Sequence, residues 1–253
     1  MDRFEKLHNF RDYGGWPVRG GRRVHSHRLY RSAHPTEASA GDLSTLREIG
    51  LSAVVDLRGK SERERWPSPW TADFPRRVFV VEEETGGLLG SLLVEARSKP
   101  GGLDAVALMR QGYAVMPFRW RLKRVLRNYF EALATCEGPV LVHCLAGKDR
   151  TGLAVALLLA LLEVEREHIV ADFMLTNAVA ANTEVALQAV RTTFGGELAE
   201  DQARELARVR PQYIEAALDA VLERHGSIAA YLREALDIPN EWLDAIRTEL
   251  VGD

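Results

Sequence analysis

The sequence contains very little cysteine. Its 253 residues include only two, Cys136 and Cys144. Small secreted domains held together by disulfides are rich in cysteine, so this composition argues against such a scaffold. The first fifteen residues, MDRFEKLHNFRDYGG, also lack the apolar stretch of a signal peptide. We therefore expect a cytoplasmic protein in a reducing compartment, with export without a signal peptide left open.

Long hydrophobic runs and a strong net charge are absent as well. The longest apolar run, residues 153–162, has about half the length of a membrane-spanning helix and is followed by Glu163. The formal net charge is only −3, which provides no broad attraction to nucleic acid or to an anionic membrane. We expect no nucleic-acid partner and no stable membrane insertion, and any anion-binding site must be local.

Short β-type runs alternate with helical patterns in the first part of the chain. The four runs are residues 28–32, 52–57, 77–82 and 138–143. The helical pattern over residues 39–49 has Ser39 as a possible N-cap and ends at Gly50. This alternation predicts an α/β fold with a central, mainly parallel sheet flanked by helices, in a single domain spanning residues 1–253.

Two regions depart from this alternation. Residues 83–117 contain two short helical pieces, around 88–97 and 103–113, separated by Gly and Pro. That pattern is expected of a movable helical lid inserted in the fold, and an ordinary helical connection between strands is an equal alternative. After residue 165 the patterns predict an all-helical C-terminal part.

The most informative segment is residues 138–163. A predicted buried strand ends at His143, and a predicted apolar helix begins near Arg150. The tight loop between them would aim its backbone N–H groups, together with those of the helix start, into one concavity that binds phosphate or sulfate. The predicted phosphate-binding residues are Leu145, Ala146, Gly147, Lys148, Asp149 and Arg150.

Side chains in this loop are suited to phosphoryl chemistry. The loop donors and the helix dipole favour the thiolate of Cys144, which is the nucleophilic form. The planar guanidinium of Arg150 can hold two phosphoryl oxygens at once, which a lysine cannot do. Gly147 permits backbone conformations and approaches that a Cβ would obstruct. Thr151 is placed to donate its hydroxyl to the Cys144 sulfur and so ease its departure.

Other polar residues are expected to support the loop. The alternation of the strand points His143 away from Cys144, so we expect it to order the strand end and not to act as a base. In residues 9–15, NFRDYGG, the glycine pair marks a turn. Asn9, Arg11 and Asp12 in this motif could brace the site by hydrogen bonds.

The segment HCLAGKDRTG resembles the signature loop, His-Cys-x5-Arg-Thr/Ser-Gly, of the protein tyrosine phosphatase superfamily. Together with NFRDYGG at 9–15 and LYRSA at 29–33, it is similar to a group of bacterial tyrosine and lipid phosphatases that includes mycobacterial protein tyrosine phosphatase B. The resemblance extends over most of the chain, and its specificity resides in the loop. The Gly-Lys pair also occurs in eukaryotic lipid phosphatases of the superfamily.

The resemblance implies a tyrosine-phosphatase-like fold and two-step phosphoryl transfer without a metal or other cofactor. Cys144 would attack phosphorus, Arg150 and the loop N–H groups would hold the equatorial oxygens, and water would hydrolyse the cysteinyl phosphate. The bacterial group implies Asp149 as the general acid. Asp56, at the end of its predicted strand, is the second candidate, and a structural role as partner of Arg58 is an equally good interpretation.

Three hypotheses for the function follow. The first is a cysteine-dependent phosphatase acting on phosphotyrosine proteins, with phosphoserine and phosphothreonine as further candidates. The second is a phosphoinositide or inositol phosphate phosphatase, which positive charge of Lys148 at the rim would favour unless that lysine is merely solvated. The third is a catalytically silent phosphate-binding module, disfavoured because the nucleophile, the arginine and the threonine are all present.

Overall fold

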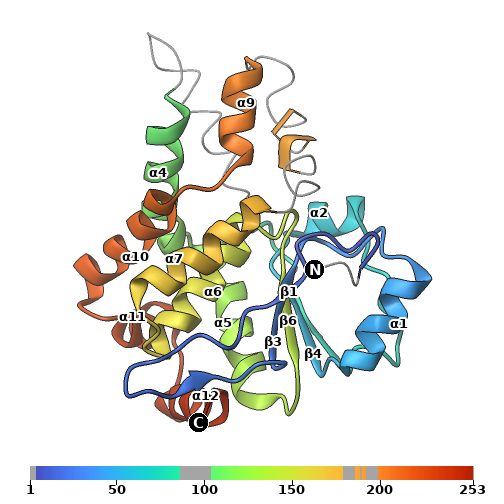
Figure 1. The fold of residues 1–253 in the computed structure, drawn as a ribbon, viewed down its shortest axis with the longest axis horizontal. Helices are drawn as coiled ribbons and strands as arrows, with labels where there is room; N and C mark the ends of the chain where they lie inside the picture. The colour runs from blue at the N-terminus through green and yellow to red at the C-terminus, as the bar shows by residue number, and fades with distance from the viewer. Residues whose placement is uncertain (1–3, 86–103, 179–185, 189, 192–198, 253) are drawn as a thin grey trace.

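The computed structural model describes residues 4–85, 104–178, 186–188, 190–191 and 199–252. In this part of the chain a five-stranded sheet has the order β1-β3-β6-β4-β5 (Figure 1). The strands are β1 (Arg11–Asp12), β3 (Leu29–Ser32), β6 (Val140–His143), β4 (Ala53–Asp56) and β5 (Arg77–Phe79). Only β1 is antiparallel to its neighbour. The mainly parallel sheet and its helices confirm the predicted fold class.

The two faces of the sheet carry alternate side chains of the same strands. On one face Tyr30, Val54 and Leu141 pack with Leu46 of α1 (Ala40–Ile49). Residues from the intervening positions, such as Val142, belong to the larger core with α5 (Trp120–Thr135) and α6 (Asp149–Leu161). Figure 1 shows α1 on one side of the sheet and α5 and α6 on the other.

The three central strands end at the same level. Ser32 of β3 pairs with His143 of β6, and His143 pairs with Asp56 of β4. The carboxyl ends of parallel strands and the loops that follow them meet at one edge, where ligands bind in open α/β sheets. The segments that follow Ser32, Asp56 and His143 are therefore neighbours.

The C-terminal part is helical, as predicted, except at its end. Helices after residue 165 include α7 (Arg166–Met174), η2 (Leu175–Ala178), α9 (Glu200–Ala207), α10 (Pro211–His225), α11 (Ile228–Leu236) and α12 (Asn240–Leu250). The prediction of helix alone is wrong for β7 (Val251–Gly252), which pairs with β2 (Arg23–Val24). Two residues are too few to show an alternating pattern, so pairing with an open strand edge decides their conformation.

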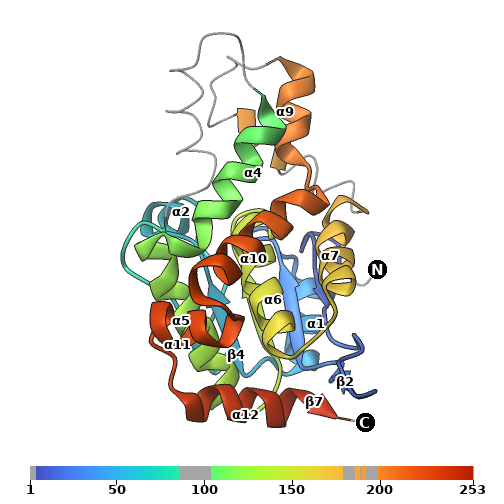
Figure 2. The same ribbon diagram turned by 90° about the vertical axis from the view of Figure 1, so that its left-hand side faces the viewer.

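Helix α4 (Ala105–Val115) projects beyond the sheet beside α9 and packs against α10 (Figures 1 and 2). It corresponds to the second helical piece of the predicted lid and continues into η1 (Met116–Phe118). The first piece, around 88–97, lies outside the described residues. Helix α2 (Lys60–Arg65) follows β4 and has no buried residue. Within the described residues, no helix is both long and apolar enough to span a bilayer.

Candidate active site

The loop between β6 and α6 passes close to the end of β3. Gly147 adopts a φ of 64°, in the left-handed region that glycine tolerates. A Cβ at this position would lie 2.4 Å from the carbonyl oxygen of Ser32, a contact that backbone atoms could relieve only by moving. Both the conformation and the close approach therefore require glycine, as the sequence predicted.

Side chains from outside the loop donate hydrogen bonds to the carbonyl oxygens at its turn. Asn9 Nδ2 donates to the carbonyl oxygens of Gly147, at 2.8 Å, and of Ala146, at 3.3 Å. Arg31 Nη2 donates to Gly147 O at 3.0 Å. Within the described part of the chain, no backbone N–H from residues 145–150 donates to another protein group. The loop thus has its acceptors occupied on one side and free donors on the other, which is how a backbone anion site is built.

Behind the loop, two arginines share one carboxylate. Arg31 Nη1 lies 2.6 Å from Asp172 Oδ2, and Arg11 Nε lies 3.3 Å from Asp172 Oδ1. Arg11 also donates to Asn9 Oδ1. Burial, together with the charge of Arg31, lowers the pKa of Arg11 to about 10. This buried network holds the Asn9 amide in the orientation that serves the loop.

The third polar residue of the NFRDYGG motif does not reach the loop. The carboxylate of Asp12 accepts hydrogen bonds from the backbone N–H groups of Gly14, at 2.8 Å, and His27, at 2.6 Å. Both partners belong to the turn and the segment before β3. The structure therefore brings Asn9 and Arg11 to the site and leaves Asp12 as a turn residue.

Cys144 lies at the base of the loop. It is only 3% exposed, and both it and Cys136 are free thiols. The neighbouring His143 is fully buried, with Nδ1 3.2 Å from Cys144 O. Burial lowers the pKa of His143, which favours a neutral ring that donates from Nδ1. Thr151 is also buried, and its hydroxyl has no hydrogen-bond partner among the described residues, so the expected bond to the sulfur is not formed in this structure.

Arg150 reaches across the edge of the sheet to α2. Its Nη1 and Nη2 atoms donate to the two carboxylate oxygens of Glu62 at 2.5 and 2.7 Å. Thr85 Oγ1 and the carbonyl oxygen of Leu57 accept from Nη1 at 2.9 and 3.2 Å. Burial alone would raise the pKa of Glu62, but the charge and hydrogen bonds of Arg150 hold it below its ordinary value. The Arg150 side chain is thus ordered and points away from bulk solvent.

Helices α4 and α9 contact the two residues that precede Arg150. Tyr113 of α4 donates its hydroxyl to Asp149 Oδ1 at 2.6 Å. Lys148 Nζ donates to the carbonyl oxygen of Leu206, in the last turn of α9, at 2.6 Å. Lys148 is only 3% exposed. Both interpretations from the sequence, a positive charge at the rim of the site and a merely solvated lysine, are therefore wrong. Carbonyl oxygens at a helix C-terminus lack intrahelical partners, which explains why this one captures the ammonium.

Asp56 faces a basic partner. Arg58 donates from Nε to Asp56 Oδ1 at 2.9 Å and from Nη2 to Oδ2 at 2.7 Å. Burial would raise the pKa of Asp56, but the hydrogen bonds and charge of Arg58 hold it below its ordinary value. A carboxylate that stays ionised in a bidentate pair is poorly suited to give up a proton, so the geometry favours the structural interpretation of Asp56.

Several site residues carried no recognisable pattern in the sequence. Glu62 belongs to KSERER, which has no apolar periodicity, and Tyr113 belongs to the predicted lid. Arg31 and Asp172 are charged residues inside a buried strand and on a packed helix. Such positions indicate paired charges, because unpaired charges are rarely buried, but they do not identify the partner.

Comparison with known proteins decides the family. A profile of the tyrosine phosphatase family matches residues 3–252. The chain belongs to the tyrosine phosphatase family. It is 36% identical over 243 residues to a candidate tyrosine-protein phosphatase of Cupriavidus necator, covering 93% of this chain and 84% of the relative. It is 30% identical over 253 residues to the triple specificity protein phosphatase PtpB of Mycobacterium tuberculosis, covering 89% of this chain and 91% of the relative.

Among solved structures, the crystal structure of Pseudomonas aeruginosa TpbA shares 19% identity with this phosphatase. The match covers 81% of this chain and 96% of TpbA, with a TM-score of 0.34.

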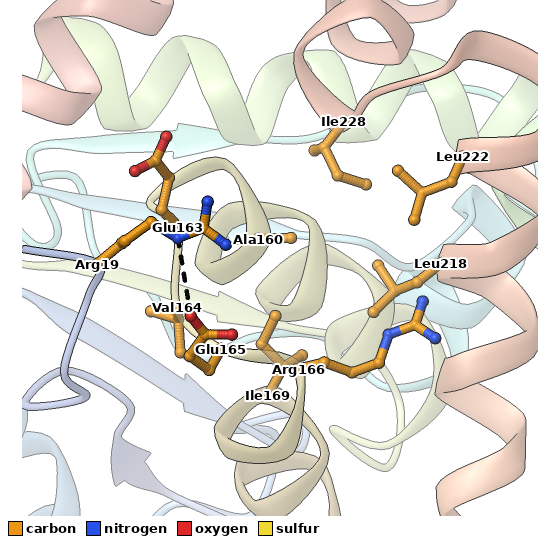
Figure 3. A pocket seen from close by; sticks show the side chains of 10 residues that line it. All are labelled: Arg19, Ala160, Glu163, Val164, Glu165, Arg166, Ile169, Leu218, Leu222 and Ile228. Atoms are coloured by element: carbon orange, nitrogen blue, oxygen red, sulfur yellow. Dashed lines mark ion pairs between the residues drawn. The ribbon is translucent and has the colours of Figure 1, made fainter.

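A separate cavity of about 230 Å³ lies at the other end of α6 (Figure 3). Its wall combines apolar side chains of α10 and α11, including Leu222 and Ile228, with charged residues such as Arg19 and Glu165. Arg19 and Glu165 form an ion pair at 3.8 Å. None of the predicted catalytic residues lines this cavity, so it is distinct from the loop site.

Proposed function

We propose that this phosphatase hydrolyses phosphotyrosine through a cysteinyl phosphate formed on Cys144. One observation carries the proposal. Side chains outside the loop donate to the carbonyl oxygens of Ala146 and Gly147, while the N–H groups of residues 145–150 have no acceptor among the residues that the structure describes. Free N–H groups in a tight loop at a helix start bind a tetrahedral anion. Cys144 at the base of that loop is placed for attack on its phosphorus.

The chemistry follows in two balanced steps. In the first, the Cys144 thiolate forms an S–P bond as the P–O bond to the leaving group breaks, and Asp149 gives the leaving oxygen its proton. In the second, water attacks phosphorus, Asp149 takes the proton of that water, and the S–P bond breaks to release phosphate. Arg150 and the loop N–H groups stabilise the three equatorial oxygens in both transition states.

The relatives support protein substrates. One is a candidate tyrosine-protein phosphatase and another a triple specificity protein phosphatase, so phosphoserine and phosphothreonine are secondary substrates to test. Phosphoinositides and inositol phosphates are the alternative. Lys148 supports these polyanionic substrates less than the sequence suggested, because it is buried against Leu206 and adds no exposed positive charge to the rim of the site.

Hydrolysis of p-nitrophenyl phosphate in the presence of a chelator tests the reaction. The wild-type protein should be active, and Cys144→Ser should lose activity while still binding inorganic phosphate. Substantial activity in Cys144→Ser would contradict the role of the thiolate. A folded wild-type protein that binds phosphate but hydrolyses nothing would instead establish the silent phosphate-binding module. Parallel kinetics on a phosphotyrosine peptide and on phosphoinositides would identify the substrate class.

We also propose that the chain forms a single domain and that it is located in the cytoplasm. The larger hydrophobic cluster includes residues from Tyr13 to Val251, which supports one phosphatase domain over residues 1–253 with a lid at about 83–117. Two free cysteines support a reducing compartment such as the cytoplasm.

A further inference from the structure

The guanidinium of Arg150 is bound along one edge and free along another. The carboxylate of Glu62 covers the end formed by Nη1 and Nη2. Within the described residues, Nε–H and the second Nη2–H donate to no acceptor. A guanidinium has five N–H donors in a fixed planar fork, and these two lie parallel on the same edge. The free edge therefore has the geometry that binds two oxygens of a phosphoryl group.

Glu62 is itself held in place. Its Oε2 atom accepts a hydrogen bond of 2.9 Å from the backbone N–H of Gly59, at the start of α2. The carboxylate is thus fixed at one side by the helix start and at the other by Arg150. Helix α2 buries no side chain, so packing of its own residues does not explain its position beside the site.

We propose that Glu62 is a positioning residue that sets the orientation of Arg150, so that the Nε–Nη2 edge faces the phosphoryl group. The inference rests on the proposed role of Arg150 as phosphate clamp. Rotation of the guanidinium would break both hydrogen bonds to Glu62, and Thr85 adds a third contact to Nη1. The arginine therefore presents its two free donors without first losing rotational freedom on substrate binding.

The variant Glu62→Gln tests the proposal, with Glu64→Gln as the matched control. An amide oxygen can accept from one Nη atom only, and the amide NH2 opposes the other. Glu64 lies on the same helix but is 66% exposed and pairs only loosely with Lys60, at 3.9 Å. Each variant removes one negative charge from α2. The measurements are kcat and KM for p-nitrophenyl phosphate, the inhibition constant of tungstate, and the midpoint of thermal unfolding.

We expect Glu62→Gln to lower kcat/KM and to raise the tungstate inhibition constant, each by about 10- to 100-fold, because both depend on the same clamp. Glu64→Gln should change neither by more than about 2-fold. A merely structural role would reduce the active fraction and hence kcat, and would leave the tungstate constant of the folded protein unchanged. An unchanged tungstate constant in folded Glu62→Gln would overturn the proposal.

A second variant keeps the test decisive if Glu62→Gln does not fold. Thr85→Val removes one acceptor from Nη1 and leaves the carboxylate pair, so it should weaken tungstate inhibition by a smaller factor, about 3- to 10-fold. No change in folded Thr85→Val would then overturn the proposal. Arg150→Lys separates this inference from the function itself. Full activity in Arg150→Lys would refute the role of Arg150 as phosphate clamp. Loss of activity in Arg150→Lys, together with wild-type activity and tungstate inhibition in Glu62→Gln, would refute only the positioning role of Glu62.

Discussion

The hydroxyl of Tyr113 donates a hydrogen bond of 2.6 Å to Asp149 Oδ1, and this contact joins α4 to the first residue of α6. Burial, with the nearby charge of Asp149, raises the pKa of Tyr113 well above its ordinary value, so the phenol keeps its proton and remains a donor. The side chain of Asp149, whose protonated form is the proposed general acid, is therefore oriented from the part of the chain predicted to form a lid.

Replacement of Asp149 by Asn should steepen the dependence of rate on the leaving group. A poor leaving group such as phenol needs a proton in the transition state, so phenyl phosphate should slow by about 100-fold or more, whereas p-nitrophenyl phosphate should slow far less. Single-turnover rates for a series of aryl phosphates would measure this. Tyr113→Phe keeps the Asp149 carboxyl and removes only the hydrogen bond that orients it, so it should steepen the dependence on the leaving group less than Asp149→Asn does. Equal slowing of all esters by Asp149→Asn would contradict its role as general acid.

Gly147→Ala should destabilise the protein and lower its activity together. The left-handed conformation costs an alanine roughly 1 kcal/mol. The new Cβ also meets the carbonyl oxygen of Ser32 at 2.4 Å, so the loop must move. Gly226 is the matched control, since its φ of 72° lies in the same region and nothing lies within 4 Å of an added Cβ. Urea unfolding and p-nitrophenyl phosphate kinetics would compare the two variants.

Gly226→Ala should lose only the conformational cost of about 1 kcal/mol and keep full activity. Gly147→Ala should lose more stability than this and at least about 10-fold in kcat/KM, because displaced N–H groups no longer fit the oxyanion. Similar effects of the two substitutions on activity would indicate that the close approach to Ser32 has no bearing on the site.

The loop was predictable from the sequence because its parts are adjacent in the chain. The buried strand, Cys144, Gly147 and the apolar helix follow one another within residues 140–161, so local patterns were sufficient. The central strands were predictable for the same reason. Short runs rich in Val and Leu indicate buried strands whatever their neighbours, although β1, β2 and β7 have only two residues each and show no pattern.

The partners of the loop residues were not predictable, because they come from distant parts of the chain. Glu62 lies 88 positions from Arg150, and the carbonyl of Leu206 lies 58 positions from Lys148. Spacing identifies which residue types the chemistry needs, but only the folded chain decides which charges meet. Lys148 illustrates this limit, since a lysine in a polar loop is usually exposed. Here it is buried and donates to the carbonyl oxygen of Leu206 in α9.

His34 should make the stability of the protein depend on pH in the mildly acidic range. Burial, with the positive charge of Arg58, lowers the pKa of its imidazole to about 4. The unfolded chain binds a proton near the ordinary value of about 6.5, so between pH 4 and 6.5 it holds more protons than the folded chain. The free energy of unfolding should therefore rise with pH across this window and be unaffected by His34 above it.

The free energy of unfolding should rise by about 2 kcal/mol across this window. A pKa shift of this extent corresponds to about 3 kcal/mol, and we reduce that figure because the ring is partly exposed to screening solvent. Urea unfolding at pH 4.5, 5.5 and 7 would measure the slope in the wild type and in His34→Gln, which cannot take up the proton. His27→Asn removes a histidine whose side chain is 86% exposed and should keep the wild-type slope. An equal slope in His34→Gln would mean that the acid sensitivity comes from other groups. A reduced slope would show that burial in the fold keeps the His34 ring neutral. The backbone N–H of His34 donates to Leu145 O at 3.0 Å, so this histidine lies beside the Cys144 loop.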